Sequence, residues 1–306
     1  MNDFRTIIHS KKPNLSDGTL KTYCSSLRSI ARGLNQSEPT LEFYKDVQTI
    51  LPYVQTIKNI QSKKSYLTAL FVLTDIPQYR EAMIQSLEAI REIDIRQEPT
   101  QKQRDAWMSM DEIHTFFHKL MSDYSDFWTA DSVLESRLQI FQNIVILACM
   151  SGIFIPPRRL LDWTEMRIRN YNPLVDNYYE NGRLVFNRYK TAKRYGRQEF
   201  NIPPELHSIL QRWIHLNPTG DYLFHNVNGD KLDASNLNIR LKNLFKRPIS
   251  CNMFRHIYIT ERVLVHQPRL QELQEIATFM AHDILTQMLY RKVDISSSSE
   301  EDTTDE

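Results

Sequence analysis

Asn252-Met-Phe-Arg255-His256, Met280-Ala-His282 and Met288-Leu-Tyr290 follow one another late in the chain, so that an arginine, a histidine and a tyrosine stand in this order. The pKa of a free tyrosine is about 10, so a tyrosine that acts as a nucleophile needs cations and hydrogen-bond donors around it. Upstream, Arg159 in Pro-Pro-Arg-Arg-Leu-Leu-Asp and Lys190 in Arg-Tyr-Lys-Thr supply further cations. This order is typical of a site that handles a phosphodiester.

Composition favours a globular protein of two domains. A chain of 306 residues is at the edge of what one core holds, and 41% hydrophobic with 25% charged residues is ordinary for a soluble protein. The formal net charge is +1, but residues 296–306 hold five acidic and no basic residues, so the rest of the chain carries +6. That mild basic excess is compatible with nucleic-acid binding.

The three cysteines, Cys24, Cys149 and Cys251, are widely spaced, which argues against a disulfide framework or a cysteine-based zinc site and favours a reducing compartment. No run of about eighteen apolar residues is present, and the N-terminus lacks the apolar stretch of a signal peptide. We expect an intracellular protein without membrane association, in the nucleus or the cytoplasm of a host.

Residues 15–94 predict four helices, the first after Ser16 or Asp17 as N-cap, because apolar residues recur at helical spacing. We therefore assign 1–94 to a helical N-terminal domain. Apolar periodicity is lost over 95–106, which contains Pro99 and is the predicted linker.

A second domain is predicted over 107–295. Ser109-x-x-Glu112 has the capping-box pattern ahead of a helix. β-Branched and aromatic residues around the Asn181-Gly182 turn predict a small antiparallel sheet. The fold class is thus mainly α with a small sheet, followed by a disordered acidic tail at 296–306. The expected strands are 163–168, 184–189 and 199–202, and the expected helices are 110–122, 132–150, 204–216, 233–246, 250–265, 270–281 and 284–293.

Across about 15–294 the chain resembles the tyrosine recombinase (phage integrase) family. Arg159-Leu-Leu-Asp162 resembles the first-arginine motif, with Arg158 as the alternative arginine. Tyr189-Lys190-Thr191 resembles the family's β-hairpin lysine motif, with Lys193 as the alternative lysine.

The later motifs fit the same family. Asn252-Met-Phe-Arg255-His256 resembles the second-arginine motif, Met280-Ala-His282 resembles the Leu-Gly-His motif, and Tyr290 falls where the nucleophile belongs. Two departures stand out. Asn252 occupies the place of a titratable His or Lys, and an amide can hydrogen-bond a phosphate oxygen but cannot transfer a proton. The interval from His282 to Tyr290 is also one residue shorter than the commonest one.

The resemblance implies a helical N-terminal domain that clamps DNA, a catalytic domain, and a site-specific recombinase or integrase of a virus or mobile element. Tyr290 would form a 3′-phosphotyrosine, with Arg159 and Arg255 on the non-bridging oxygens and Lys190 as the acid for the 5′-oxygen. His282 and Asn252 would hydrogen-bond the phosphate. Because the ester conserves the bond energy, no ATP, metal or other cofactor is required, and no small molecule is a substrate.

Double-stranded DNA is the expected partner, bound by a homo-oligomer, a tetramer in the strand-exchange reaction. Phosphate contacts would give affinity and register. The candidate DNA-binding residues are Lys21, Arg28 and Arg32 in the first domain and Arg188, Lys193, Arg194, Arg197 and the basic run 240–247 in the second.

Three other functions remain open from the sequence: a type IB topoisomerase-like nicking and closing enzyme, a non-catalytic DNA-binding descendant suggested by Asn252, and a helical interaction scaffold. The acidic tail would compete with DNA for a basic cleft, bind a partner, accept phosphates at its Ser-x-x-Glu/Asp pattern, or serve only as a solubilising end. His114 and His118 lie four apart but have no third ligand nearby in the sequence, so a solvated helix face is expected there.

Overall fold

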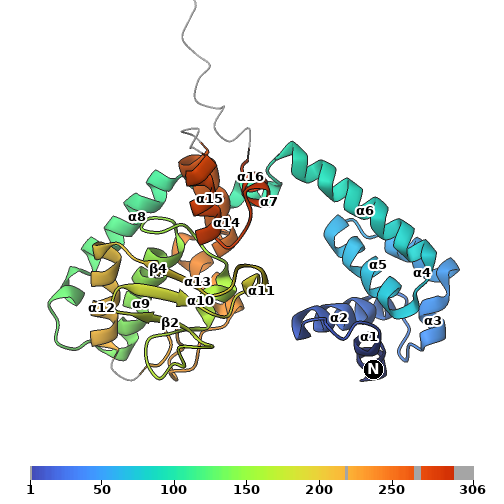
Figure 1. Cartoon of the computed structure of the whole chain (residues 1–306), viewed down its shortest axis with the longest axis horizontal. Coiled ribbons are helices and arrows are strands. Elements are labelled where there is room, and N and C mark those ends of the chain that lie inside the picture. The colour runs from blue at the N-terminus through green and yellow to red at the C-terminus, as the bar shows by residue number, and fades with distance from the viewer. Residues whose placement is uncertain (1, 218–219, 265–269, 293–306) are drawn as a thin grey trace, which may run out of the picture. The chain divides into compact units, whose positions relative to one another are not determined.

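The computed structural model describes residues 2–217, 220–264 and 270–292. Contacts between residues divide the chain into two compact units, Met1–Arg96 and Gln97–Glu306 (Figure 1). The predicted linker, 95–106, contains the end of one helix and the whole of α7 (Gln101–Ala106), which the loss of apolar periodicity did not predict. The predicted tail at 296–306 lies outside the described residues.

Over residues 2–96 the first unit consists of six helices, whereas four were predicted. The second of the predicted helices, expected from the apolar positions of residues 43–54, is split at Asp46, whose carboxylate accepts a hydrogen bond from the Thr49 amide and caps a new helix. The N-terminal helix α1 was not predicted. The elements are α1 (Asn2–Lys11), α2 (Asp17–Gly33), α3 (Leu41–Lys45), α4 (Val47–Gln55), α5 (Ile60–Thr74) and α6 (Pro77–Arg96).

Helix α5 is the centre of this unit and packs against α1, α2, α3, α4 and α6. It is apolar on several sides, with Leu67, Ala69, Leu70 and Leu73 all buried, as expected of a helix enclosed by others. Gly33, the last residue of α2, lets this helix approach Tyr53 of α4 closely. A Cβ at this position would lie 1.8 Å from the Tyr53 hydroxyl oxygen, so no larger residue fits without a shift.

The second unit places a small sheet among helices. Its elements are α7, α8 (Met110–Asp123), η1 (Ser125–Trp128), α9 (Glu135–Met150), α10 (Leu160–Thr164), β1 (Met166–Arg167), β2 (Asn177–Glu180), β3 (Arg183–Phe186), α11 (Ala192–Tyr195), β4 (Gln198–Asn201), α12 (Pro204–Leu216), α13 (Ala234–Phe245), α14 (Cys251–Tyr258), the π-helical turn η2 (Ile259–Val263), α15 (Leu270–Phe279) and α16 (Ile284–Met288).

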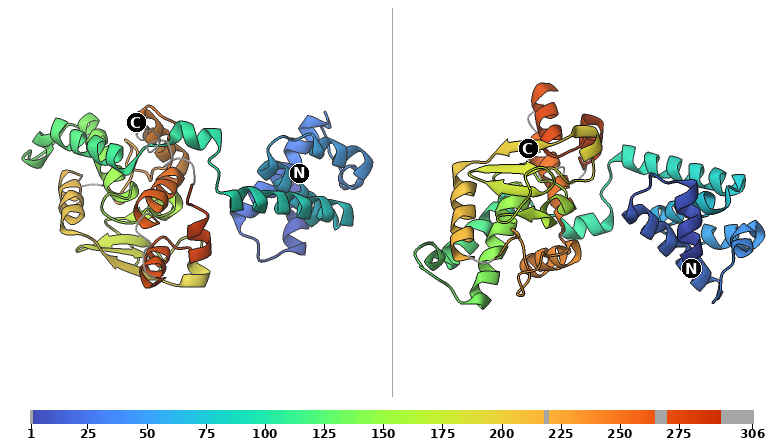
Figure 2. Two further views of the ribbon diagram at one scale, coloured as in Figure 1. Left: turned by 90° about the horizontal axis from the view of Figure 1, so that it is seen from above. Right: turned by 60° about the horizontal axis from the view of Figure 1, so that its bottom comes forward.

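The sheet has the strand order β1-β2-β3-β4 (Figures 1 and 2). β2, β3 and β4 pair antiparallel, which confirms the predicted small antiparallel sheet, and β1 adds a parallel pairing with β2, so the whole sheet is mixed. The expected strand over 163–168 was too long. Trp163 belongs to α10, where its side chain is fully buried in the core.

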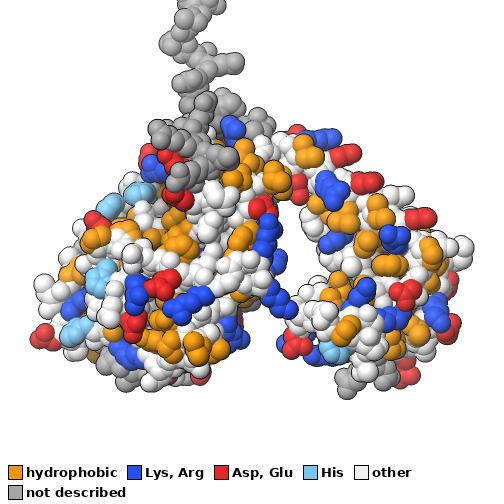
Figure 3. Space-filling model, viewed as in Figure 1, with side chains coloured by type: hydrophobic (Ala, Val, Ile, Leu, Met, Phe, Trp, Pro, Cys, Tyr) orange, Lys and Arg blue, Asp and Glu red, His pale blue; other side chains and the backbone are white. Residues whose placement is uncertain are grey.

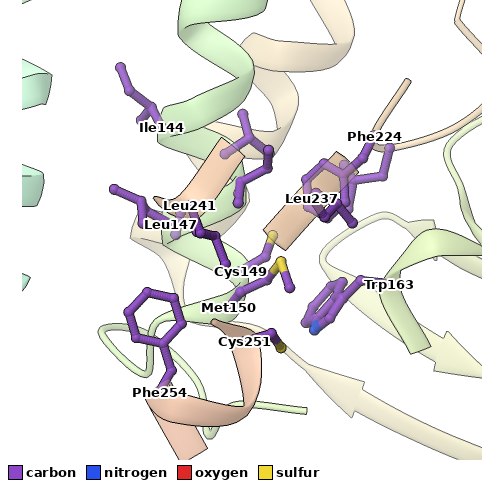
Figure 4. Close-up of a cluster of buried hydrophobic side chains, with 14 of the residues drawn as sticks. Ile144, Leu147, Cys149, Met150, Trp163, Phe224, Leu237, Leu241, Cys251 and Phe254 are labelled. Carbon is purple, nitrogen blue, oxygen red and sulfur yellow. The ribbon is translucent and has the colours of Figure 1, made fainter. Parts of the chain in front are cut away.

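Helix α9 is the axis of the core of this unit. Its residues from Ile144 to Met150 are fully or almost fully buried, because α12, α13, α14 and one face of the sheet pack around them. Figure 4 shows Ile144 and Leu147 of α9 beside Leu241 of α13, with Cys149, Met150, Trp163 and Cys251 below them. Helices α10 and α14, which position Arg159 and Arg255, are thus anchored in one core. None of the helices in the described ranges is long and apolar enough to cross a membrane.

The capping box predicted at the start of α8 is confirmed. Ser109 Oγ accepts from the Glu112 amide at 3.0 Å, and the Glu112 carboxylate accepts from the Ser109 amide at 2.7 Å. Replacing Ser109 by Ala is therefore expected to destabilise the second unit by about 1 kcal/mol. All four tryptophans, Trp107, Trp128, Trp163 and Trp213, lie in this unit, so their emission during denaturation measures its unfolding.

The matched control for this prediction is Ser122→Ala, at an exposed serine near the other end of α8. We expect it to change the free energy of unfolding by less than about 0.5 kcal/mol. Equal losses in both variants would contradict a specific role for the cap.

Candidate active site

The two adjacent arginines before α10 have different environments. Arg159 is the N-cap residue of α10, and its Nη1 donates to the Ala281 carbonyl at 2.6 Å. Burial, followed by the charge of Arg255, lowers its pKa. Arg158 is fully buried, donates through Nε to Asp162 at 3.1 Å, and lies 3.9 Å from the centre of the Phe186 ring. Arg159 therefore belongs to the candidate site, and Arg158 lies in the core beneath it.

Arg255 projects from α14 and is fully buried. Its Nη1 donates to the carbonyls of Pro157 (3.0 Å) and Met280 (3.3 Å), which belong to the segments before α10 and after α15. Its Nη2 lies 2.7 Å from Nδ1 of His282. One guanidinium thus joins three segments that are far apart in the sequence.

The hydrogen bonds of His282 fix its protonation. A guanidinium only donates, so Nδ1 of His282 accepts from Arg255 and carries no proton. Nε2 lies 3.1 Å from Oε1 of Gln287, so a neutral ring donates from Nε2 to this amide oxygen. Burial, followed by the charge of Arg255, lowers the pKa of His282 to about 4, in agreement with a neutral ring. Both ring nitrogens are used within the protein, so a phosphate bond from Nε2 would require Gln287 to give way.

Tyr290 follows the short helix α16, and its ring lies on the residues just described. The ring stacks on His282 with centroids 5.4 Å apart and 24° between the planes. It also covers Arg255, whose guanidinium carbon lies 4.7 Å from the ring centre. Arg159, Arg255, His282 and Tyr290, four residues predicted from the sequence, therefore lie together.

The segment between β3 and β4 lies against the same turn. Thr191 Oγ1 donates to the Ala281 carbonyl at 3.1 Å, which is also the acceptor of Arg159, and Arg194 pairs with Asp283 at 3.3 Å. Lys190 is exposed and directly precedes Thr191. Ala281 has a φ of 55°, in the left-handed region that favours glycine, and stands where the family motif has Gly. The turn at Ala281 thus has one carbonyl oxygen that accepts hydrogen bonds from both Arg159 and Thr191, the residue after Lys190.

Asn252 does not lie on these four residues directly. It is exposed on α14, and its Nδ2 lies 3.3 Å from Nε2 of His256. His256 in turn lies beside Tyr290, with Nδ1 2.9 Å from the Tyr290 carbonyl oxygen.

Buried donors around the site lack acceptors. Among the described residues, Nε of Arg255, Nη2 of Arg158 and Nε2 of Gln287 are buried without a hydrogen-bond partner. Unpaired buried side-chain atoms also occur elsewhere in the described part of the chain, for example at Gln139, Trp163 and Arg240, so this feature does not single out the candidate site.

Most of the candidate DNA-binding residues are exposed, whereas Arg240 is half-buried. Lys21, Arg28 and Arg32 lie on α2 at spacings of seven and four residues. In the second unit, Lys and Arg side chains gather where α11 lies in Figure 1 (Figure 3). Several of this unit's candidates already have partners: Arg194 pairs with Asp283, and Arg197 donates to Glu199 at 3.1 Å and to the Tyr178 hydroxyl at 3.2 Å. In the basic run 240–247, Arg240 donates to Gln139 and Arg247 donates to the Trp107 carbonyl. Arg188 and Lys193 are exposed.

Sequence reasoning missed the residues that hold the site together. Gln287 is a fully buried polar residue, and Gln103 of α7 reaches His256 from a segment predicted to be a linker. A single sequence gives no indication of a buried glutamine. The acid three residues after Arg159 was visible, but its partner is Arg158.

No family model and no curated protein matches this chain. Solved structures do. The Tn1549 transposon integrase, in complex with circular intermediate DNA, is 13% identical over 94% of this chain and 94% of that one, with a TM-score of 0.55.

Two further structures match at lower scores. The XerA recombinase is 14% identical over 94% of this chain and 93% of its own, with a TM-score of 0.41. The XerH site-specific recombinase bound to palindromic difH substrate is 15% identical over 89% and 75%, with a TM-score of 0.47. The similarity to the transposon integrase spans both units, and the chain therefore has the tyrosine recombinase fold.

Proposed function

We propose that this protein is a site-specific DNA recombinase that cleaves and rejoins strands through a 3′-phosphotyrosine on Tyr290. The observation that carries the proposal is the meeting of Arg159, Arg255, His282 and Tyr290 around one turn. The DNA-bound transposon integrase, which shares the fold, supports DNA as the substrate.

In the proposed reaction, Tyr290 Oη attacks the phosphorus, the bond to the 5′-oxygen breaks, and a phosphotyrosine forms. The guanidiniums of Arg159 and Arg255 would stabilise the charge that develops on the non-bridging oxygens. Lys190 would protonate the departing 5′-oxygen from its exposed position beside Thr191. Rejoining is the reverse step with another 5′-hydroxyl, so atoms and bond energy are conserved without a cofactor.

Exchange between two duplexes breaks four strands, one for each nucleophile. We therefore propose that four copies of the chain assemble on DNA. The basic residues of α2, together with Arg188, Lys193 and neighbouring cations, would bind backbone phosphates and make the affinity fall with salt.

Because the target sequence is not known, the test selects DNA sequences that become covalently attached to the protein. Duplexes with a randomised centre are incubated with the full chain, and DNA that stays attached in denaturing detergent is sequenced. We expect one class of sequence to be enriched, a free 5′-hydroxyl at the break, and DNA attached to the peptide that contains Tyr290.

Two results would contradict the proposal. Sequences enriched without denaturant but never attached covalently would identify a DNA-binding protein without catalysis. Relaxation of supercoiled DNA by a monomer, without sequence preference, would identify a nicking and closing enzyme instead.

A further inference from the structure

The contact between His256 and Tyr290 defines the proton on the imidazole. Nδ1 lies 2.9 Å from the Tyr290 carbonyl oxygen, which can only accept, so Nδ1 carries the hydrogen. Burial is the main cause that lowers the pKa of His256 to about 4, so the ring is neutral and its Nε2 is an acceptor. His256 and His282 are thus neutral with hydrogens on opposite ring nitrogens.

Two amides face the acceptor nitrogen of His256. Gln103 Nε2 lies 3.4 Å from Nε2, and Asn252 Nδ2 lies 3.3 Å from it. The orientation of the Gln103 amide is fixed independently, because its Oε1 accepts from the Thr100 backbone amide at 2.8 Å in the capping box of α7. The nitrogen of Gln103 therefore points to His256.

A continuous chain of donors results. Thr100 donates to Gln103, Gln103 donates to His256, and His256 donates to the carbonyl of Tyr290. The imidazole also packs on the phenol, with centroids 4.9 Å apart at 51°. On its other side, the Tyr290 amide donates to the Gln287 carbonyl at 3.0 Å. The main chain of Tyr290 is held at both its amide and its carbonyl.

We propose that His256 is a positioning residue for the nucleophile: its Nδ1–H holds the Tyr290 carbonyl, and Gln103 and Asn252 fix its tautomer from the opposite side. The inference rests on the proposed function, in which Tyr290 attacks DNA. It assigns Asn252 to the support of His256 instead of to the phosphate. Displacement of a nucleophile by about 1 Å lowers the rate about 100-fold. Loss of the hydrogen bond that holds the Tyr290 main chain is therefore expected to slow cleavage.

The first test reads the tautomer in the DNA-free full chain by nitrogen NMR with ¹⁵N-labelled histidine. The resonances of His256 are assigned by their loss in His256→Asn. We expect Nδ1 to be protonated and Nε2 to be unprotonated at neutral pH. A proton on Nε2 alone would overturn the proposal whether or not the protein cleaves DNA.

The second test measures single-turnover strand cleavage on the selected duplex. His256→Leu is expected to lower the rate about 100-fold, whereas His256→Asn, whose amide N–H can replace Nδ1–H, should stay within about tenfold of wild type. Gln101→Leu, an exposed change on the same helix as Gln103, is the matched control and should cleave like wild type. Equal rates for wild type and His256→Leu would overturn the positioning role while leaving the proposed function intact.

A double-variant comparison tests the assignment of Asn252. Asn252→Leu alone is expected to slow cleavage about fivefold, the effect of one neutral hydrogen bond. In the His256→Asn background the same change should have no further effect, because the acceptor nitrogen is gone. Losses that multiply would show that Asn252 acts independently of His256 and would overturn this part of the proposal. A chain that forms no adduct with any duplex would instead refute the proposed function.

Discussion

Tyr290→Phe is expected to abolish the covalent protein–DNA adduct, lowering strand cleavage by at least about 1000-fold, since removal of a nucleophile eliminates the reaction it begins. The phenyl ring keeps the contacts that the structure shows, the stacking on His282 and the cover over Arg255. Non-covalent affinity for DNA and stability should therefore change little. The measurement is adduct formation on a nicked duplex from which the cleaved piece diffuses away.

Tyr258→Phe is the matched control for this variant. Tyr258 packs in the same small cluster as Tyr290 but lies on the side of α14 against Gly152, where a Cβ would meet its ring at 2.7 Å. We expect it to form adduct at the wild-type rate. An adduct that persists in Tyr290→Phe would mean that another residue is the nucleophile.

Asp162→Ala is expected to destabilise the second unit by about 3–5 kcal/mol, because it leaves the charge of Arg158 buried without a partner. Both side chains are fully buried. Burial raises the pKa of Asp162 and lowers that of Arg158 to about 10, so in each case desolvation outweighs the attraction between the two charges.

Tryptophan emission during denaturation measures this effect in the unit that contains the pair. Asp126→Ala is the control, since Asp126 forms a 2.7 Å ion pair with Arg137 whose side chains are 51% and 41% exposed, and its loss should cost less than about 1 kcal/mol. The double variant Arg158→Met/Asp162→Leu should recover most of the stability, because no buried charge remains. A loss below about 1 kcal/mol in Asp162→Ala would show that Arg158 finds another partner.

The sequence predicted those parts of the fold that depend on local patterns. Helix α12 begins and ends where the apolar stripe after Pro203 predicted, and the Ser109–Glu112 cap was read from residue types alone. The parallel pairing of β1 with β2 was not predictable in the same way. β1 has only two residues, too few to show an alternating pattern, and its pairing with β2 depends on tertiary contacts.

In the candidate site, too, residues in local sequence motifs were predictable and residues placed by tertiary contacts were not. The order of Arg159, Arg255, His282 and Tyr290 was visible because each lies in a short motif. The choice between Arg158 and Arg159 depended on which side of α10 faces the core, and the partners Gln103 and Gln287 are set by tertiary contacts that leave no periodic pattern. Asn252 looked like a departure from the phosphate-binding motif, whereas its contact in the fold is His256.

The distribution of aromatic and thiol side chains has a practical consequence for the two units. The tryptophans all belong to the second unit, whereas Cys24 lies on α2 of the first, and it is the one cysteine of three that is not buried. With light that excites tryptophan but not tyrosine, an acceptor dye attached to the native Cys24 would thus receive energy only from donors in the other unit. The unmodified sequence already contains the pair of probes needed to follow, by fluorescence transfer, the distance between the units as DNA is added.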